Sequence, residues 1–338
     1  KGNGTYTDDV QFSNTLHAVF VRSPHPHARF TKIETSAAKA MEGVCGVFTL
    51  EDFPKDIQDN KLLLLLPNPS IVQPMMPYLL ARDEVHFAGE AVACVVAESR
   101  YLAEDAAAAI AIDWEVLPSA SDAREAVKSG APLSHSDGKD NISARFVNEY
   151  GDVAGAFSGA SHRVVVSIRH HRGGGHSLEG RGTLAVYDPD EGRTILWSAT
   201  QAPHQVKRNI IGVLNWNENE IDVIAPEVGG GFGPKAMFYA EEAVIPFIAR
   251  QLCRPVKWIE DRREHFLSAS QERDQYWDLE VGDNKFSVKL SFLSLASTFG
   301  APSFLASVLT TSSFLASTFG ASSFLTSSSV LTGAKFSS

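Results

Sequence analysis

The sequence predicts an α+β fold with about two domains. Its 338 residues, of which 44% are hydrophobic, are enough to bury a large core, and chains of this length commonly divide into domains. Short apolar runs typical of strands are interleaved with segments of high helix propensity. Both kinds of segment occur across the chain up to residue 290, so we expect helices and sheets in each domain.

Residues 1–118 contain the elements of the first predicted domain. Apolar runs predict its strands at residues 16–21, 44–48, 91–97 and 110–116. Ser99 can cap an alanine-rich helix between the last two strands, because a serine oxygen accepts a hydrogen bond from the first helical turn. Ser36 likewise precedes a short helical turn at 37–41. Residues 119–140 lie in a stretch rich in Ser, Pro, Gly and charged residues, which predicts a linker.

Residues 141–290 contain the second predicted domain. Its strands are expected at residues 163–169, 183–187, 194–198 and 221–225. The second and third strands form a hairpin around residues 188–192, and Pro203 suits the first turn of the helix that follows. A last helix is expected at 236–252 with a kink at Pro246, because an interior proline that removes a hydrogen bond costs about 3 kcal/mol.

A glycine-rich loop precedes this last helix. Residues 225–235 read Ala-Pro-Glu-Val-Gly-Gly-Gly-Phe-Gly-Pro-Lys. Each glycine costs roughly 0.5 to 1 kcal/mol in conformational entropy, so their clustering is favoured where main-chain amides must face a ligand without a Cβ in the way. The helix N-terminus expected at residue 236 would add partial positive charge. We therefore predict an anionic, phosphate-bearing cofactor here, with Lys235 either neutralising its charge or solvated at the helix start.

Two alternatives to this cofactor site are a nucleotide site and a tight turn without a ligand. A P-loop is excluded, because Pro234 and Ala236 occupy the positions where that motif needs Gly and Ser or Thr. Gly231, Gly233 and Ala236 satisfy the looser form of the dinucleotide-binding motif, but no acidic residue occupies a second-strand position about 20 residues later. A nucleotide site and a tight turn without a ligand therefore remain alternatives.

The histidines do not predict a metal site. His170 and His171 are adjacent and point to opposite sides of a strand, and neither they nor His176 have an acidic or thiol partner within the cluster. We expect the intervening glycines 173–175 to line a cofactor or substrate cavity. The remaining histidines of the first domain are far apart and lack carboxylates at ligand spacing, namely His17, His25, His27 and His86.

Charge and cysteine content exclude several classes of protein. Thirty basic and forty acidic residues give a net charge of −10 without any Lys/Arg-rich run, which argues against a nucleic-acid surface. Cys45, Cys94 and Cys253 are widely separated, so we expect a reduced, cytoplasmic protein whose cysteines form no iron–sulfur motif. No signal peptide is recognised, and the apolar run at 62–66 is too short to cross a membrane.

Six further stretches and the glycine loop occur in the order that is typical of one protein family. They are Tyr-Thr-Asp-Asp at 6–9, Val-Arg-Ser-Pro-His-Pro-His-Ala-Arg at 21–29, Val-His-Phe-Ala-Gly-Glu-Ala-Val-Ala at 85–93, Leu-Glu-Gly-Arg-Gly at 178–182, Trp-Ser-Ala-Thr-Gln-Ala-Pro-His at 197–204 and Trp-Ile-Glu-Asp-Arg-Arg-Glu-His at 258–265. Over residues 1–281 the chain thus resembles the molybdenum hydroxylases. It is most similar to the molybdopterin-binding large subunit of the xanthine dehydrogenase, aldehyde oxidase and carbon monoxide dehydrogenase type.

The resemblance implies a fold and a cofactor. Residues 1–118 would form an α/β hammerhead domain, and residues 141–290 the N-terminal part of the molybdopterin-binding domain. The cofactor would be molybdopterin, the Mo cofactor, held by Gln201, Gly230, Gly231, Phe232 and Gly233, with Phe232 walling the cavity. Replacing Gly231 with valine is then expected to abolish binding by placing a branched side chain against the cofactor. The alternative for Gln201 is a residue at the helix entry that hydrogen-bonds its own backbone.

The resemblance also implies an oxidoreductase with partner chains. Such enzymes hydroxylate an electron-poor carbon of an aldehyde, N-heterocycle or purine, or oxidise carbon monoxide, and the cofactor carries the redox chemistry. Iron–sulfur clusters and FAD are expected on partner subunits. The family's catalytic glutamate belongs to a Gly-x-Gly-Glu motif that is absent here, so no catalytic residue is assigned. Ala236 stands where purine-oxidising relatives carry a substrate-binding acid.

Residues 291–338 depart from the rest of the sequence. Fifteen of these 48 residues are serine, and Lys335 is the only charged one. Residues 295–305 recur at 315–325 with one change, which makes a low-complexity tandem repeat. We expect a shifted reading frame or misassembled sequence outside the native fold, with a genuine association repeat as the alternative. The chain is thus expected to be a truncated enzyme subunit that is inactive alone, or else a non-catalytic fragment that binds cofactor or partner.

Overall fold

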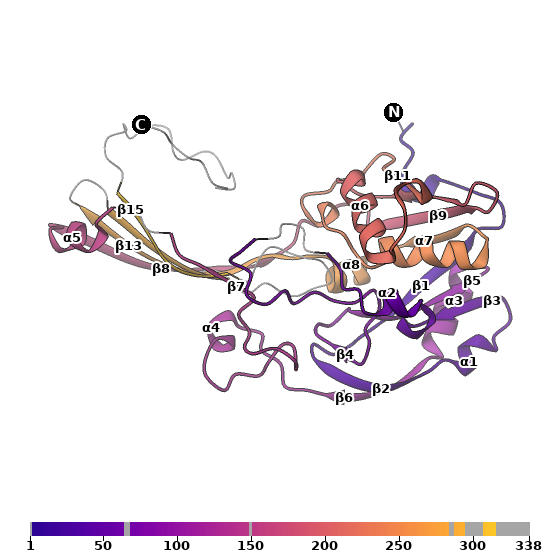
Figure 1. Ribbon diagram of the computed structural model, residues 1–338, viewed down its shortest axis with the longest axis horizontal. Helices are drawn as coiled ribbons and strands as arrows, with labels where there is room; N and C mark the ends of the chain where they lie inside the picture. Colours follow the sequence, from indigo (N-terminus) through magenta and orange to yellow (C-terminus); the bar gives the residue numbers. More distant parts are fainter. Residues whose placement is uncertain (1, 64–67, 149–150, 284–286, 295–306, 316–338) are drawn as a thin grey trace. The chain divides into compact units, whose positions relative to one another are not determined.

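The computed structural model describes residues 2–63, 68–148, 151–283, 287–294 and 307–315. The chain divides into two compact units (Figure 1). The first consists of Lys1–Phe146, Arg169–Tyr276 and Phe292–Val308, and the second of Val147–Ile168, Trp277–Ser291 and Leu309–Ser338.

The N-terminal part of the first unit alternates strands with short helices. Its strands are β1 (Leu16–Arg22), β2 (Ala28–Glu34), β3 (Val44–Phe48), β4 (Glu84–Val85), β5 (Ala91–Ala97), β6 (Ala111–Val116) and β7 (Ala144–Phe146). Its helices are α1 (Ser36–Lys39), α2 (Lys55–Gln58), α3 (Arg100–Ala108) and α4 (Ala123–Ala126), with 3₁₀ turns at Thr7–Asp9 and Leu50–Asp52. The predicted cap is confirmed, because Ser99 Oγ accepts a hydrogen bond from Leu102 N at 3.3 Å. The four predicted strands are confirmed within one residue at each end.

The C-terminal part of the first unit contains the predicted hairpin and the helices that follow it. These elements are β9 (Gly182–Asp188), β10 (Arg193–Ser198), α6 (Pro203–Leu214), β11 (Ile221–Ile224), α7 (Glu241–Leu252), β12 (Val256–Ile259) and α8 (Arg262–Ser268), with 3₁₀ turns η3 (Glu218–Glu220) and η4 (Pro234–Ala236). β9 and β10 pair in antiparallel fashion, with Thr183 opposite Ser198. Pro203 is the first residue of α6, as its fixed φ angle predicts.

One seven-stranded sheet contains strands from both predicted domains. Its order is β11-β10-β9-β12-β1-β5-β3. β1 pairs in parallel with β12, where Leu16 lies opposite Val256, and pairs in antiparallel fashion with β5. All seven residues of β5 are buried, as expected for a strand covered on both faces. The sheet therefore has no break between the N-terminal and C-terminal segments, and the domain boundary near residue 118 stays a prediction.

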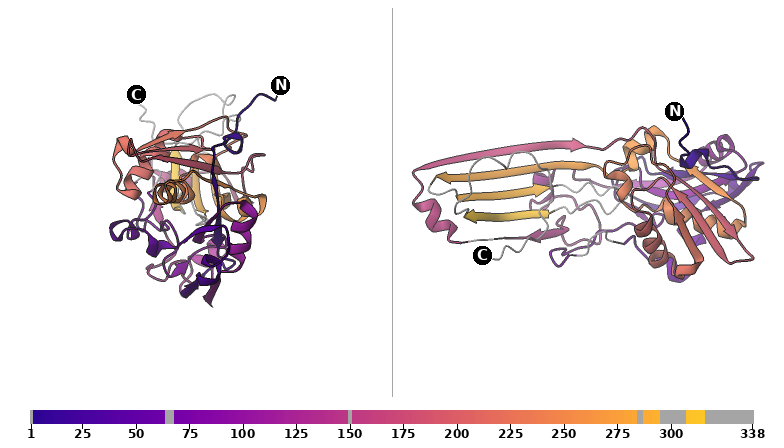
Figure 2. Two further views of the ribbon diagram at one scale, coloured as in Figure 1. Left: turned by 90° about the vertical axis from the view of Figure 1, so that its right-hand side faces the viewer. Right: turned by 90° about the horizontal axis from the view of Figure 1, so that it is seen from above.

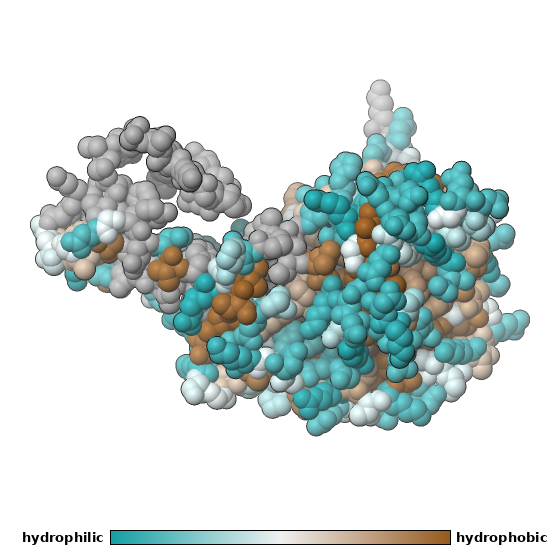
Figure 3. Space-filling model, in the orientation of Figure 1, coloured by the Kyte–Doolittle hydropathy of each residue, from teal (hydrophilic) through white to brown (hydrophobic). Residues whose placement is uncertain are grey.

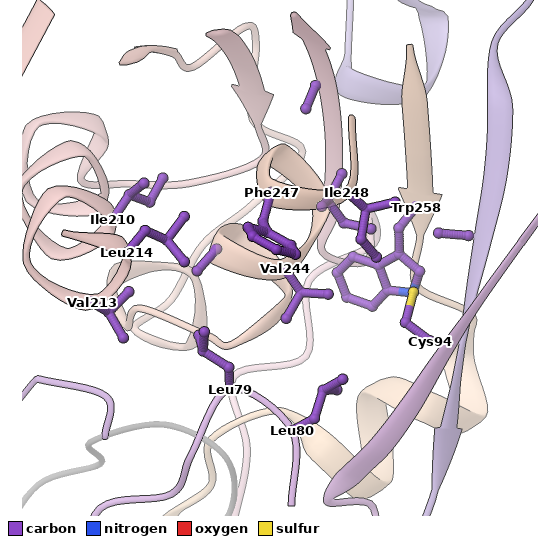
Figure 4. Close-up of a cluster of buried hydrophobic side chains, with 14 of the residues drawn as sticks. Leu79, Leu80, Cys94, Ile210, Val213, Leu214, Val244, Phe247, Ile248 and Trp258 are labelled. Atoms are coloured by element: carbon purple, nitrogen blue, oxygen red, sulfur yellow. The ribbon is translucent and has the colours of Figure 1, made fainter. Parts of the chain in front are cut away.

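Helix α7 lies at the centre of the core beside this sheet. Figure 4 shows Val244, Phe247 and Ile248 of α7 between the apolar side of α6 and Trp258 of β12. The α6 residues that face it are Ile210, Val213 and Leu214. Burial of each such aliphatic or aromatic side chain contributes about 1.5 to 3 kcal/mol. Residues 241–249 of α7 are all buried, which is typical of a helix surrounded by protein.

A smaller sheet covers another part of the first unit. Its order is β4-β2-β6, and β2 pairs in antiparallel fashion with both neighbours. It has its own cluster of buried side chains from Ala28, Phe30, Ala81, Val85 and Val92. On the face of the first unit seen in Figure 3, hydrophilic residues cover most of the described surface. No helix in the described part of the chain is long and apolar enough to cross a membrane.

The second unit contains most of the residues of four long strands. Strands β8 (His162–Gly173), β13 (Glu272–Asp283), β14 (Ser287–Ser294) and β15 (Ser307–Leu315) lie side by side in the order β15-β14-β13-β8 (Figure 2). Within this unit, Ser167 Oγ donates to Asp278 Oδ1 at 2.6 Å, and Asp152 caps helix α5 (Val153–Ser158). β15 falls in the segment that we expected to lie outside the native fold. Most of the predicted repeat, at 295–306 and 316–338, lies outside the described residues.

The predicted helix at 236–252 begins too early. α7 begins at Glu241, whereas Pro234–Ala236 form a 3₁₀ turn and Met237 is extended, with φ −79° and ψ 151°. The reason is tertiary, since Tyr239 is buried and its hydroxyl accepts a hydrogen bond from Ser270 N at 3.1 Å. The glycine loop therefore has no long helix directly behind it. Pro246 does lie inside α7, as predicted.

Candidate functional site

The glycine loop leaves the end of β11 in a conformation that requires glycine at particular places. The φ angles are +94° at Gly230 and +104° at Gly233, and Phe232 also has a positive φ of +53°. Left-handed backbone costs a non-glycine residue roughly 1 kcal/mol or more, so the conformation of Phe232 must be held by its surroundings. Phe232 is 73% exposed, and its side chain therefore does not wall a closed cavity in the described residues.

Gln201 lies against this loop. Its backbone N–H donates to Lys235 O at 2.8 Å, and its side-chain Oε1 accepts from Gly233 N at 3.1 Å. A Cβ at Gly231 would overlap with the Gln201 side chain. The structure thus brings Gln201 together with Gly231 and Gly233, and among the described residues the Gln201 side chain makes no hydrogen bond to its own backbone. The loss of cofactor binding expected for Gly231→Val also has a cause within the protein, because the valine side chain would collide with Gln201.

Several donors at this junction remain available. Gly230 N donates to Val228 O at 2.9 Å, but within the described residues the N–H groups of Gly231 and Phe232 have no hydrogen-bond partner. The Nε2 group of Gln201 likewise makes no hydrogen bond to the described part of the chain. Amide donors next to a turn with positive φ angles form a concavity that suits an anionic oxygen. The residues therefore fit a ligand with anionic or carbonyl oxygens.

A buried ion pair holds the two ends of the loop. Glu179 Oε2 accepts from Gly229 N at 2.7 Å and from Lys235 Nζ at 2.7 Å. The Lys235 side chain is fully buried, so the expectation of a solvated lysine is wrong. Burial lowers the pKa of Lys235, and the Glu179 carboxylate opposes that shift. Glu179 could not be predicted as a site residue from the sequence, because no spacing pattern pairs it with a lysine 56 positions later.

The glycines expected to line a cavity lie beside the same loop. A Cβ at Gly175 would come within 2.7 Å of Phe232 O and 2.8 Å of Phe232 Cβ. A Cβ at Gly230 would come within 2.7 Å of the Phe232 ring and 3.1 Å of Ser177 Cβ. Close approach of the Phe232 backbone explains glycine at position 175, whereas the positive φ angle explains it at position 230. The cavity role of residues 173–175 stays a prediction.

The segment from Glu179 to the start of β9 is anchored at Arg181 by a network of buried charges. Arg181 Nη2 donates to Glu260 Oε1 at 2.5 Å, and Arg181 Nη1 lies 3.4 Å from Glu241 Oε2. Glu241 is also paired with Arg22 of β1 at 2.6 Å. Burial by itself would lower the pKa of Arg181 and raise the pKa of Glu260. The attraction between the opposite charges outweighs burial, so the pKa of Arg181 is raised and that of Glu260 is lowered. His265 Nδ1 lies 2.8 Å from Glu260 Oε2 and completes the pairing.

A small cavity lies between the loop and this network, lined by residues of both. Its volume open to water is about 10 Å³, close to the space that one water molecule needs. Glu242 lines it and accepts from Ser198 Oγ at 2.7 Å and from Tyr239 N at 3.0 Å. Burial raises the pKa of Glu242 to about 7. Thr183 Oγ1 and Trp258 Nε1 line the same space, and neither has a hydrogen-bond partner within the described residues.

Histidines elsewhere form a different arrangement. His27 Nε2 lies 2.9 Å from Glu84 Oε1, and the rings of His86 and His135 stack with their centroids 3.9 Å apart. Burial lowers the pKa of His135 to about 3, whereas the Glu90 carboxylate helps to raise the pKa of His86. In the described part of the chain no three His, Cys, Asp or Glu residues are grouped so that they could hold a metal ion.

Two family models match this chain. The aldehyde oxidase and xanthine dehydrogenase a/b hammerhead domain matches residues 1–118, and the molybdopterin cofactor-binding domain matches residues 134–301. Their order along the chain is the order expected from the sequence. The structure, with its mixture of helices and sheets, agrees with the predicted α+β class.

Relatives of established activity are similar over most of this chain. The nicotine 6-hydroxylase large subunit of Paenarthrobacter nicotinovorans is 39% identical over 84% of the chain and 34% of its own length. The carbon monoxide dehydrogenase large chain of Afipia carboxidovorans is 35% identical over 84% of the chain and 36% of its own length. The crystal structure of quinoline 2-oxidoreductase from Pseudomonas putida 86 matches 90% of the chain and 39% of its own, with 30% identity and a TM-score of 0.81. The chain therefore spans about a third of the length of these relatives.

Proposed function

The chain belongs to the molybdenum hydroxylase family, as a part of its molybdopterin-binding large subunit, and we propose that its glycine loop forms one side of a molybdopterin site. Support comes from the amides of Gly231 and Phe232 and the Nε2 group of Gln201, which lie together and have no hydrogen-bond partner among the described residues. These donors belong to two elements, the loop after β11 and the entry of α6, that the Gln201–Gly233 hydrogen bond holds together. This convergence is the observation that carries the proposal.

The roles of the chain's own residues follow from their donors. The Gln201 amide is held by its Oε1, so its Nε2 can donate to an oxygen of the bound group in a fixed direction. The amides of Gly231 and Phe232 can donate beside it. Molybdopterin, when bound, would supply the two-electron redox chemistry of the reaction. The protein's contribution here is to bind and orient that group.

The reaction that we propose for the whole protein is hydroxylation of an electron-poor carbon with water. The candidate substrates are an aldehyde, an N-heterocycle or a purine, and the named relatives act on nicotine, quinoline and carbon monoxide. The large-subunit names of the relatives favour partner subunits, which we propose to carry iron–sulfur clusters and FAD, in a cytoplasmic complex. We retain residues 1–118 as the hammerhead domain, 119–140 as its linker and 141–290 as the start of the cofactor domain.

A second candidate is a fragment that binds cofactor or partner without turnover. The observation that favours it is the absence of a Gly-x-Gly-Glu motif from the 338 residues. The two candidates share the cofactor site and differ only in catalysis. Turnover of an N-heterocycle or aldehyde by the purified chain with its partner subunits would decide for the enzyme, and cofactor content without turnover would decide for the fragment.

The cofactor site itself is tested by Gly231→Ala. The new Cβ would collide with the Gln201 side chain, so we expect the chain purified from a molybdopterin-producing host to lose at least about 90% of its pterin and molybdenum, a loss of roughly 1.4 kcal/mol or more in binding. Gly212→Ala is the matched control, because its Cβ would meet only the flexible end of Leu63. Pterin fluorescence and metal analysis measure both variants. Equal contents in Gly231→Ala and the wild type would refute the site.

A further inference from the structure

The Glu179 carboxylate makes two contacts that together close a ring around the glycine loop, and the Glu179 backbone N–H also donates to Gly229 O at 3.3 Å. The carboxylate Oε2 accepts from the backbone of Gly229, before the turn, and from the side chain of Lys235, after it. The residues with positive φ angles and the free amides lie between these two points. A single carboxylate oxygen therefore ties the start of the loop to its end.

Burial and charge make this tie different from a surface ion pair. The Lys235 side chain is fully buried and that of Glu179 is 20% exposed. A lysine in such a place has few alternatives, since an unpaired buried ammonium is strongly destabilising. Lys235 is also fixed through its carbonyl, which accepts from Gln201 N at 2.8 Å and from Thr200 Oγ1 at 3.1 Å. Lys235 thus connects Glu179, through its ammonium group, to the entry of α6, through its carbonyl group.

We propose that Glu179 is a positioning residue for cofactor binding. Its carboxylate holds Gly229 and Lys235 together, a link that we call the clasp, so that the amides of Gly231 and Phe232 stay available to the ligand. The inference rests on the proposed function, because it gives these amides a cofactor to face. It also gives Lys235 a task other than neutralising a bound anion, since its ammonium is directed to Glu179. Glu179 itself need not touch the cofactor.

The first test is hydrogen–deuterium exchange of the full chain, followed in peptides that cover residues 226–237. Glu179→Gln leaves Lys235 without a counter-charge, so we expect these amides to exchange about tenfold faster or more, the factor that corresponds to loss of one charge-assisted hydrogen bond. Glu220→Gln is the matched control. Glu220 also accepts from a backbone amide, Asn217 N at 2.7 Å, and from a cation, Arg250 at 2.8 Å, and its side chain is 22% exposed.

The second test separates positioning from simple stabilisation. Glu179→Gln combined with Lys235→Met removes both charges, and such replacement of a buried pair commonly restores stability. We expect the double variant to recover the thermal midpoint of the wild type while its loop still exchanges fast and its pterin content stays low. Recovery of loop protection and pterin content together with the midpoint would overturn the positioning role. Unchanged loop exchange in Glu179→Gln would overturn the clasp.

The two proposals fail in different ways. If the wild-type chain retained no pterin, the proposed function would fail, and the exchange comparison between Glu179→Gln and Glu220→Gln would still decide whether the clasp exists. If pterin binding were present in the wild type and normal in Glu179→Gln, the positioning role would fail and the cofactor site would stand.

Discussion

The glycine loop and the charge network around Arg181 line the same small cavity. They differ in how far their polar groups are paired. In the network, Arg181 is matched by Glu260 and Glu241, and Glu241 is matched again by Arg22. In the loop, consecutive amides at Gly231 and Phe232 have no partner among the described residues. Unpaired amide donors in a binding loop are therefore compatible with a stable fold when the neighbouring buried charges are paired.

The largest effect is expected when the network is broken. Glu260→Gln leaves Arg181 as a buried cation with too little counter-charge, and breaking such a pair costs about 3 to 5 kcal/mol. Urea unfolding of the full chain measures the loss. Glu220→Gln, which breaks the partly exposed pair with Arg250, should change stability by less than about 1 kcal/mol. Similar losses in the two variants would mean that burial of the network does not matter.

The next effect is a pH dependence that comes from Glu242, beneath the loop. Burial raises the pKa of Glu242 to about 7 from an ordinary value of 4.5. As the pH rises, the unfolded state loses this proton first, so the stability of the folded chain falls between about pH 4.5 and pH 7. The pKa difference corresponds to at most about 3 kcal/mol. Glu242→Gln should remove this fall, and unfolding free energies from pH 5 to pH 8 measure it. A fall of the same size in the variant would show that other groups cause it.

A smaller effect is expected at Tyr239, whose ring centroid lies 3.9 Å from the guanidinium carbon of Arg181 in the charge network. Its hydroxyl donates to Pro234 O of the loop and accepts from Ser270 N at 3.1 Å. Tyr239→Phe leaves both groups without this partner in a buried place, which should cost about 1 to 3 kcal/mol. Denaturant unfolding gives the loss, and hydrogen exchange should show it concentrated in peptides that contain Pro234 and Ser270. Exchange that rises evenly across the chain would contradict the link.

The smallest effect is expected in the loop itself. Phe232 is mostly exposed and has a positive φ, so Phe232→Gly removes backbone strain and little buried surface. The unfolding free energy should change by less than about 1 kcal/mol, since the relief of strain is offset by the greater entropy of unfolded glycine. Thermal and urea unfolding check this. A loss above about 2 kcal/mol, on the order of burying a large apolar side chain, would show that the ring is packed against protein.

Local patterns made much of the fold predictable. The cap at Ser99, the β9–β10 hairpin and the start of α6 at Pro203 follow from residues within one or two turns of each other. Gln201 and the glycine loop could be predicted as partners through the family resemblance. The start of α7 could not, because Met237 and Tyr239 are buried and the Tyr239 hydroxyl is held by Ser270, which lies 31 residues later in the chain.

The sequence by itself determined the α+β class, the family and the place of the glycine loop, because alternating apolar runs, capping residues and glycine clusters act over short distances. Only the tertiary structure decided that β1 pairs with β12 in one sheet, that Lys235 is buried and that Glu179 ties the loop. Those features depend on which distant segments meet when apolar surface is removed from water. A charge is acceptable inside such a core only when a partner arrives with it.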